Sequence, residues 1–243
     1  MKKKLLCAVL CCVATLLPAK AIEIRPVVGG TGTLNYMNTE GHDIAALPAA
    51  FGGNNFDKTI NYDNTAFHAG TVLGVAILFE KFFLELDHQY NFGSINSRIF
   101  QDNRIDGGIV IGELVLNFRE KNAQALSFKA GYALTDSVDV FAKLDLLLSS
   151  FKLSYQNIET GLSNSVTRKR YGIAPGFGIQ KSFFDGWLTL RGEYGYHMFK
   201  MIKTGNISKE VGAAAPSLNL TARPRFHKFT LGVLCRFNLG GKK

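Results

Sequence analysis

Residues 82–92, FFLELDHQYNF, alternate between two kinds of side chain. Every second residue from Phe82 to Phe92 is apolar or aromatic apart from His88, and Glu85 and Asp87 stand among the residues between them. A repeat of two residues is typical of a β-strand whose two faces meet different surroundings. A soluble sheet would bury the apolar face. A membrane barrel turns that face toward lipid and its carboxylates toward a polar lumen.

The first 21 residues have the layout of a signal peptide. Lysines at positions 2–4 precede an apolar stretch at 5–18, and Ala19-Lys20-Ala21 gives the small-x-small pattern of a cleavage site. We predict cleavage after Ala21 and a mature domain of residues 22–243. The alternative is an uncleaved anchor, but the apolar stretch is shorter than the roughly 20 residues that a spanning helix needs.

The predicted mature chain excludes several classes of protein. Removal of four lysines leaves 24 Lys and Arg against 19 Asp and Glu, a net charge of +5, and no basic-aromatic stripe suggests nucleic-acid binding. Cys235 is the one cysteine after residue 21, which excludes an internal disulfide or a cysteine metal cluster. The five histidines have no metal-ligand spacing, so we expect neither a metal nor another cofactor.

The alternation of residues 82–92 recurs along the chain. Counting a first, glycine-rich strand, eight strands of about ten residues are predicted, which is the length that a tilted strand needs to cross a membrane. Short turns at 80–81, 135–137 and 183–186 alternate with long intervals at 38–66, 93–124, 155–169 and 202–224. The prediction is an all-β fold, an eight-stranded antiparallel up-and-down transmembrane barrel with short periplasmic turns and long extracellular loops. The alternative class is a secreted β-sandwich or soluble barrel. The predicted strands are 23–37, 67–79, 82–92, 125–134, 138–150, 171–181, 187–199 and 228–237.

One segment does not fit this count. Residues 107–118, GGIVIGELVLNF, have the composition of a strand but lie within the second long interval. A further crossing there would place the tight turn at Thr135 on the wrong side of the membrane. We interpret the segment as an extension of the third or fourth strand, or as a hairpin with residues 96–104, with a ten-stranded barrel as the alternative.

Several segments resemble a known family. LELDHQY, AQALSFKAGYALTDSVDVFAKL, YGIAPGFGIQKSF, LTLRGEYGY and FTLGVLCRF are similar to successive strands of the transmembrane domain of the outer-membrane protein A family, within a wider group of opacity-type surface barrels. The resemblance covers most of residues 67–237. It implies an eight-stranded barrel in the outer membrane of a Gram-negative bacterium, mobile surface loops and no active site. Only six residues follow Phe237, so we expect no peptidoglycan-binding domain.

The resemblance also implies a cluster of charges inside the lumen. In the family, a lumen glutamate on the third strand pairs with a basic residue on the fourth or seventh strand and forms a plug that acts as a gate. The matching positions are Glu85, Lys129 and Arg191, and an acidic position on the sixth strand is Gln180 here, which makes the cluster more basic. The alternation turns Lys143, Asp145 and Glu193 toward the same lumen.

The remaining expectations concern function and partners. Ser127, His197 and Asp139 face inward in the predicted register, which makes a hydrolase an alternative, but polar residues line any such lumen. We predict a monomeric, non-enzymatic structural barrel. A surface adhesin that binds a host ligand and a narrow gated pore are the alternatives. The expected partners are outer-membrane lipid, the assembly machinery through the last strand, and lipopolysaccharide phosphates near the basic runs 167–170 and 223–225.

Overall fold

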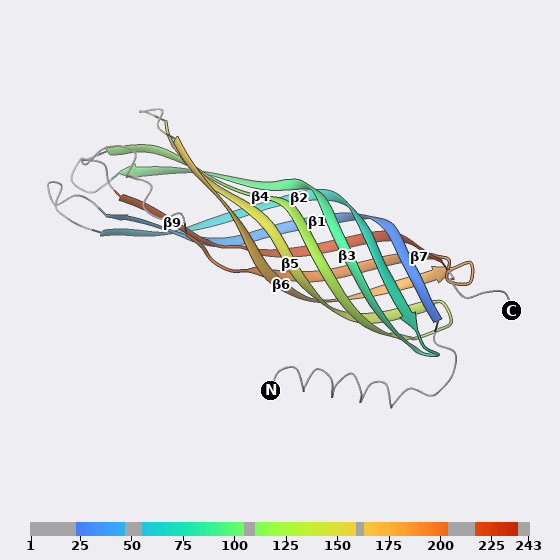
Figure 1. The fold of residues 1–243 in the computed structure, drawn as a ribbon. Helices are drawn as coiled ribbons and strands as arrows, with labels where there is room; N and C mark the ends of the chain where they lie inside the picture. The colour runs from blue at the N-terminus through green and yellow to red at the C-terminus, as the bar shows by residue number, and fades with distance from the viewer. Residues whose placement is uncertain (1–22, 47–54, 105–109, 159–162, 204–216, 238–243) are drawn as a thin grey trace, which may run out of the picture.

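The structure is a computed structural model that describes residues 23–46, 55–104, 110–158, 163–203 and 217–237. These residues form one elongated antiparallel barrel (Figure 1). No helix within the described ranges is long and apolar enough to cross a membrane. The predicted cleavage residues Ala19 and Ala21 lie outside the described part of the chain. The strands are β1 (Glu23–Ala46), β2 (Asn55–Leu78), β3 (Phe82–Arg104), β4 (Val110–Ala133), β5 (Val138–Asn157), β6 (Ser163–Phe183), β7 (Leu188–Phe199), β8 (Ile202–Lys203), β9 (Ser217–Arg223) and β10 (Arg225–Arg236).

Eight strands form the closed wall, which confirms the predicted fold class. Their order is β10-β7-β6-β5-β4-β3-β2-β1, and pairing of β10 with β1 closes the barrel. The short β8 and β9 lie at the loop end, where β9 pairs with the outer part of β1. Strand β9 is separated from β10 only by Pro224, which has no N–H to donate to a strand ladder.

The three short turns lie together at one end of the barrel, where β1 also begins and β10 ends (Figure 1). In the β6–β7 turn, Phe184 and Asp185 have φ angles of 52° and 55°, and Gly186 N–H donates to Phe183 O at 3.1 Å. Positive φ at both central residues gives the turn the handedness that suits twisted antiparallel strands. The described strand ends that lead into the long intervals, such as Ala46, Arg104 and Asn157, all lie at the opposite end of the barrel.

The predicted strands are shorter at the loop end than the strands of the structure. β2 begins at Asn55 rather than near residue 67, and β6 begins at Ser163 rather than near residue 171. Residues 110–118 extend β4 and pair with both β3 and β5. The predicted extension is therefore confirmed, and the ten-stranded alternative is wrong. The outer parts of the strands lie beyond the apolar outer surface, and we call them together the β extension. They include residues 55–66 of β2, 110–121 of β4, 150–157 of β5 and 163–170 of β6.

The β extension reverses the pattern of the membrane-facing part. On β5 the outward residues are leucines at 144, 146 and 148, whereas the following outward positions are Ser150, Lys152 and Ser154. Inward positions change in the opposite sense, from Lys143 and Asp145 to Phe151 and Leu153. A strand with apolar residues inside and polar residues outside is the pattern of a soluble barrel. The alternation that is typical of a membrane strand therefore ends at this change.

The β extension has its own hydrophobic core. Phe151 lies at its centre, with its ring centroid 5.5 Å from that of Phe118, 4.9 Å from that of Phe199 and 6.2 Å from that of Phe226. Phe118, Phe151 and Phe226 are fully buried, and they belong to three different strands. We call this group the aromatic core. Its other buried members include Met37, Ile60, Tyr62, Ile95, Leu116, Leu147, Leu153 and Ile202.

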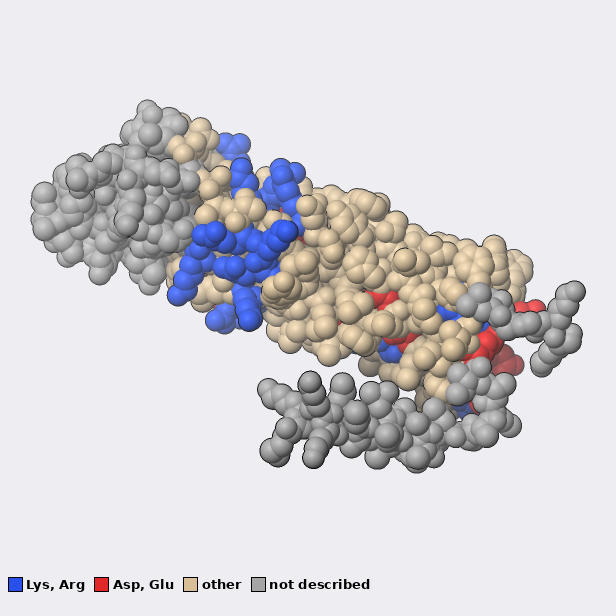
Figure 2. All heavy atoms as spheres, in the orientation of Figure 1, with Lys and Arg blue, Asp and Glu red and all other residues tan. Residues whose placement is uncertain are grey.

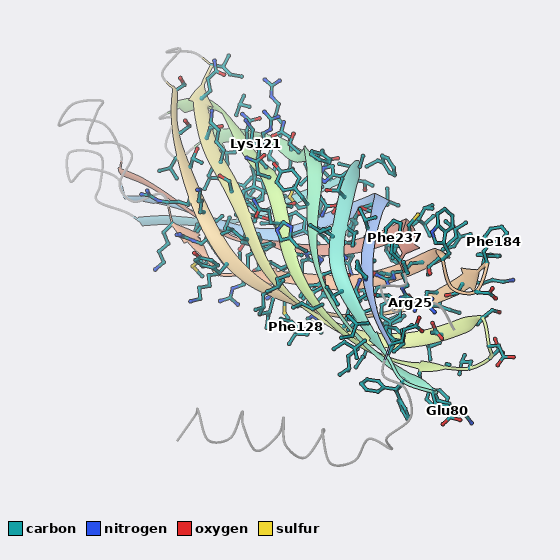
Figure 3. All side chains as sticks on the ribbon, turned by 45° about the vertical axis from the view of Figure 1, so that its right-hand side comes forward. Arg25, Glu80, Lys121, Phe128, Phe184 and Phe237 are labelled. Atoms are coloured by element: carbon teal, nitrogen blue, oxygen red, sulfur yellow. The ribbon has the colours of Figure 1, made fainter. Side chains whose placement is uncertain are left out.

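On β4 the reversal depends on a bulge, whereas β5 keeps the same inward positions throughout and changes only its residue types. The register with β5 slips between Lys121 and Gln124, and Asn122 has a φ of 54°. One extra residue moves every following side chain to the other face of a strand. Phe118 therefore faces the core and Lys121 faces outward. Figure 3 shows Phe128 and Lys121 on this strand, with Lys121 nearer the loop end.

Candidate functional site

A cluster of ionic side chains fills the lumen near the short-turn end. It combines residues from six strands, all at most 8% exposed. Register places Lys129 directly opposite both Glu85 and Lys143, and Gln180 opposite Arg191. Strand tilt brings positions from distant strands to one level of a barrel. We call the group the lumen ion cluster, and its members are Glu85, Asp87, Lys129, Lys143, Asp145, Gln180, Arg191, Glu193 and Arg236.

Arg191 and Glu85 form the best-defined contact of the cluster. Arg191 Nη1 lies 2.6 Å from Glu85 Oε1, and Nη2 donates to Oε2 at 2.7 Å. Two parallel bonds between a guanidinium and a carboxylate fix both position and orientation. Arg236 Nη2 also donates to Glu85 Oε2 at 2.9 Å. Glu85 therefore accepts from two arginines on neighbouring strands.

Lys129 connects the two halves of the cluster. Its Nζ lies 2.6 Å from Asp87 Oδ2 and 2.7 Å from Glu193 Oε1, but 3.6 Å from Glu85 Oε1. Glu193 in turn lies 2.8 Å from Lys143, which is 3.0 Å from Asp145. The structure thus brings together all seven predicted lumen residues, but Lys129 contacts Asp87 and Glu193 more closely than Glu85.

Gln180 is held by both arginines. Its Oε1 accepts from Arg191 Nε at 3.1 Å, from Arg191 Nη2 at 2.9 Å and from Arg236 Nη2 at 3.0 Å. Its Nε2 donates to Asp139 Oδ2 at 2.7 Å. An amide can make both kinds of bond at once, whereas a carboxylate here would face Asp139 without a proton to donate. The local geometry therefore accounts for an amide at this position.

The charges of the cluster balance. Glu85, Asp87, Asp145 and Glu193 supply four carboxylates, and Lys129, Lys143, Arg191 and Arg236 supply four cations. Gln180 therefore leaves no excess of positive charge. Charges that are paired and hydrogen-bonded avoid most of the cost of burial, whereas an unpaired charge in the same place does not.

Arg236 is the member that the sequence analysis missed. The alternation of the last strand does turn it inward, but it stands at the end of that strand, where a side chain usually meets water. The register pairs it with Val27, and its contacts lie on β3 and β6. Only the stagger of the closed barrel places it level with Glu85.

The structure does not assemble the Ser/His/Asp set. Ser127 lies opposite Asp145, six residues from Asp139 along β5 and therefore roughly 20 Å away. His197 Nε2 is 4.0 Å from Asp145, and Asp139 bonds to Gln180 instead. Among the described residues, no three His, Cys, Asp or Glu side chains converge as metal ligands would.

A second ionic contact lies between the lumen ion cluster and the aromatic core. Lys228 Nζ donates to Glu120 Oε2 at 3.4 Å, and both side chains are buried. Glu120 faces inward because of the bulge at Asn122, and sequence alternation alone would have turned it outward. This pair lies between the two larger groups that fill the lumen, the ion cluster and the aromatic core.

A polar vestibule opens at the short-turn end. Its volume is about 850 Å³, and its wall includes Arg25, Glu80 and Phe184, which Figure 3 labels at this end of the barrel. Phe83, Asp139 and Arg236 also line it. Because Arg236 belongs to the lumen ion cluster, the vestibule ends at the cluster.

Comparison with known sequences identifies one family. The model of the OmpA-like transmembrane domain matches residues 39–241. Comparison with curated proteins by sequence finds no match.

Solved structures share the barrel architecture at low sequence identity. The protease OmpT of Escherichia coli is 8% identical, with a TM-score of 0.52, over 87% of this chain and 97% of that one. The attachment invasion locus protein Ail of Yersinia pestis is 11% identical, with a TM-score of 0.39, over 86% and 99%. Neisserial surface protein A is 10% identical, with a TM-score of 0.34, over 85% and 97%.

Proposed function

Because the chain belongs to the OmpA-like transmembrane domain family, and is an integral β-barrel surface protein of the outer membrane, we propose that it is a non-enzymatic barrel closed to ions. In this proposal it anchors a rigid β extension at the cell surface. The observation that carries the proposal is the filling of the lumen at two separate levels, by the lumen ion cluster and by the aromatic core.

The two levels oppose ion passage for different reasons. At the lumen ion cluster, an ion would have to displace bonds such as those between Arg191 and Glu85. At the aromatic core, it would have to leave water for a space filled by Phe118, Phe151 and Phe226. Opening the ion cluster alone would leave the second level closed. A gate formed by Glu85, Lys129 and Arg191 is therefore insufficient to make this barrel a pore.

Planar-bilayer conductance tests the proposal. The wild type, Glu85→Ala and Phe151→Ala should each be electrically silent, and only the double variant Glu85→Ala/Phe151→Ala should pass small ions. Folding of each variant is checked by the heat-dependent shift in gel mobility. Steady channels from the wild type, or from folded Glu85→Ala alone, would contradict the closed barrel and favour the gated pore.

The lack of an enzyme activity is part of the same proposal. It is supported by the separation of Ser127 from Asp139 and by the burial of His197 behind the aromatic core. The likeness to the protease OmpT concerns the fold. Incubation of the folded protein with a mixed peptide library should leave every peptide intact. Cleavage that is lost in a Ser127→Ala variant would overturn this part.

Attachment to a host surface is the second candidate function. It is favoured by the polar outer face of the β extension, on which Ser150, Lys152 and Ser154 lie beyond the apolar outer positions of β5. Cells that export the wild-type protein should then bind host cells more strongly than cells that export a variant with shortened loops. Equal binding would contradict the attachment function, and only the structural role would remain.

A further inference from the structure

Four cations form a compact patch on the outer face of the β extension. Arg119 and Lys121 lie on β4, Lys152 on β5 and Lys169 on β6, and all four are exposed. Figure 2 shows Lys and Arg side chains gathered at the end of the barrel that carries the long connections, beside the broad uncharged surface. We call Arg119, Lys121, Lys152 and Lys169 the cation patch.

The register shows how close these cations are. Arg119 is directly opposite Lys152, while Lys121 and Lys169 are opposite Ser150 from its two sides. Neighbouring strands are about 4.8 Å apart, so the patch spans roughly 10 Å across three strands. Like charges directly opposite each other destabilise a sheet. An anion placed between them would remove that repulsion.

Among the described residues of the surrounding sheet, no acidic side chain faces outward beside the patch. The described outward positions around it are Ser94, Asn96, Arg98, Asn117, Ser150, Ser154, Ser165 and Thr167, and none is acidic. Arg119 Nη2 donates to Ser94 Oγ at 2.8 Å, and within the described ranges none of the four cations forms an ion pair with a carboxylate. Hydroxyl and amide groups beside cations suit a ligand that combines phosphate with sugar or glycerol hydroxyls.

The position of the patch selects the source of the anion. Leu148 precedes Ser150 on the outer face of β5, and Tyr171 follows Lys169 on the outer face of β6. Both side chains are therefore about 7 Å along the strands from Lys121 and Lys169, and about 13 Å from Arg119 and Lys152. A lipid whose chains lie against Leu146, Leu148 and Tyr171 would place its headgroup at the patch. A soluble anion has no acyl chains, so the apolar surface beside the patch would not strengthen its binding.

We propose that the cation patch binds the phosphorylated headgroup of a glycolipid in the outer leaflet. Arg119 suits a two-point contact with phosphate, and the lysines supply mobile point charges. The inference goes beyond the closed barrel proposed above, because a barrel closed to ions needs no lipid site. Of the basic runs 167–170 and 223–225, where lipopolysaccharide contact was predicted, only Lys169 belongs to this patch, and the other three cations lie outside both runs.

The test uses the folded protein in detergent micelles and a fluorescent, doubly phosphorylated disaccharide glycolipid. A patch variant, Lys121→Gln/Lys152→Gln, is compared with Lys81→Gln/Lys181→Gln, which removes two exposed lysines near the short-turn end. At about a fivefold effect for each lysine near a phosphate surface, the patch variant should bind roughly 30-fold more weakly. The control variant should stay within about twofold of the wild type. Lys121→Arg/Lys152→Arg should retain binding.

Further ligands identify what the patch recognises. The same glycolipid without phosphates should bind poorly, and inorganic phosphate or a sulfated polysaccharide should compete only weakly. Equal binding of the dephosphorylated lipid, or an equal loss in both glutamine variants, would overturn the proposal. Stronger competition by the polysaccharide than by the phosphorylated lipid would also overturn it, in favour of a soluble polyanion.

Discussion

Arg191 on β7 and Glu85 on β3 join opposite sides of the barrel through two parallel bonds. The atoms Nη1 and Oε1 are 2.6 Å apart, and Nη2 and Oε2 are 2.7 Å apart, with both side chains almost fully buried. The partners are 106 residues apart in sequence. Because neither charge can reach bulk water in this geometry, each depends on the other for its compensation.

We predict strong coupling between these two residues. Glu85→Ala leaves Arg191 and Arg236 without the carboxylate that they share, and loss of one partner of a buried pair costs about 3–5 kcal/mol in the free energy of unfolding. A double variant, Glu85→Ala/Arg191→Ala, should recover part of that loss. Urea unfolding of the protein in detergent, with all four members of the cycle, measures the coupling free energy.

Glu80→Ala provides the control for this cycle. Glu80 is an exposed carboxylate in the β2–β3 turn, where an ion pair contributes at most about 1 kcal/mol. Its removal should change the unfolding free energy far less than Glu85→Ala. Strict additivity of the Glu85 and Arg191 variants would mean that the pair is not coupled.

The sequence predicted the membrane half of the barrel well because one physical rule governs it. Lipid outside and a polar lumen inside impose a period of two with a fixed sense, so the inward positions of Glu85, Lys129 and Arg191 could be read directly. Their closeness could not be derived from the period alone, and it came from the family resemblance. The extension of β4 was predicted, but the greater length of β2 and β6 and the reversed polarity of the β extension were not, because the same period appears there with the opposite sense.

Two further features depended on information that alternation does not contain. The bulge at Asn122 shifts the faces of β4, and a single asparagine among polar neighbours gives no clear signal of a positive φ. The place of Arg236 depends on the stagger of the closed barrel, which a list of separate strands does not specify. Asparagine is enriched at positive φ, so its place between two alternating runs of opposite phase was the available signal.

The outward face of β5 changes from apolar to polar along the strand. We therefore predict that an arginine substitution destabilises the protein by different amounts at two outward positions. Leu146→Arg puts a cation against lipid near the middle of the apolar surface, which costs about 2–4 kcal/mol. Ser154→Arg adds the same side chain to the polar face of the β extension and should cost less than about 1 kcal/mol. The folded fraction in vesicles, read from heat-dependent gel mobility, compares them. Similar yields for both variants would argue against the assigned membrane boundary.

The predicted signal peptide gives a test that does not depend on the barrel. Ala19-Lys20-Ala21 predicts cleavage before Ile22 on export. The intact mass of protein extracted from outer membranes should match a chain that begins at Ile22. Replacing Ala21 with a bulky residue, as in Ala21→Phe, should slow processing, whereas Ala21→Ser should not. A mature mass that includes residues 1–21 would show that the segment is retained.

The aromatic core predicts that the two halves of the barrel can be destabilised separately. Phe151 is surrounded by Phe118, Phe199 and Phe226, so Phe151→Ala should cost about 3–5 kcal/mol locally. Lys152→Ala, the next residue on the same strand, faces outward and should have little effect. An external protease should then cut the β extension of the Phe151 variant within β5 or β6. The lumen ion cluster should meanwhile keep the membrane half folded and resistant to heat. If the Phe151 variant resists the protease as well as Lys152→Ala does, the aromatic rings do not hold the β extension together. Loss of the whole barrel would show instead that the two halves fold as one unit.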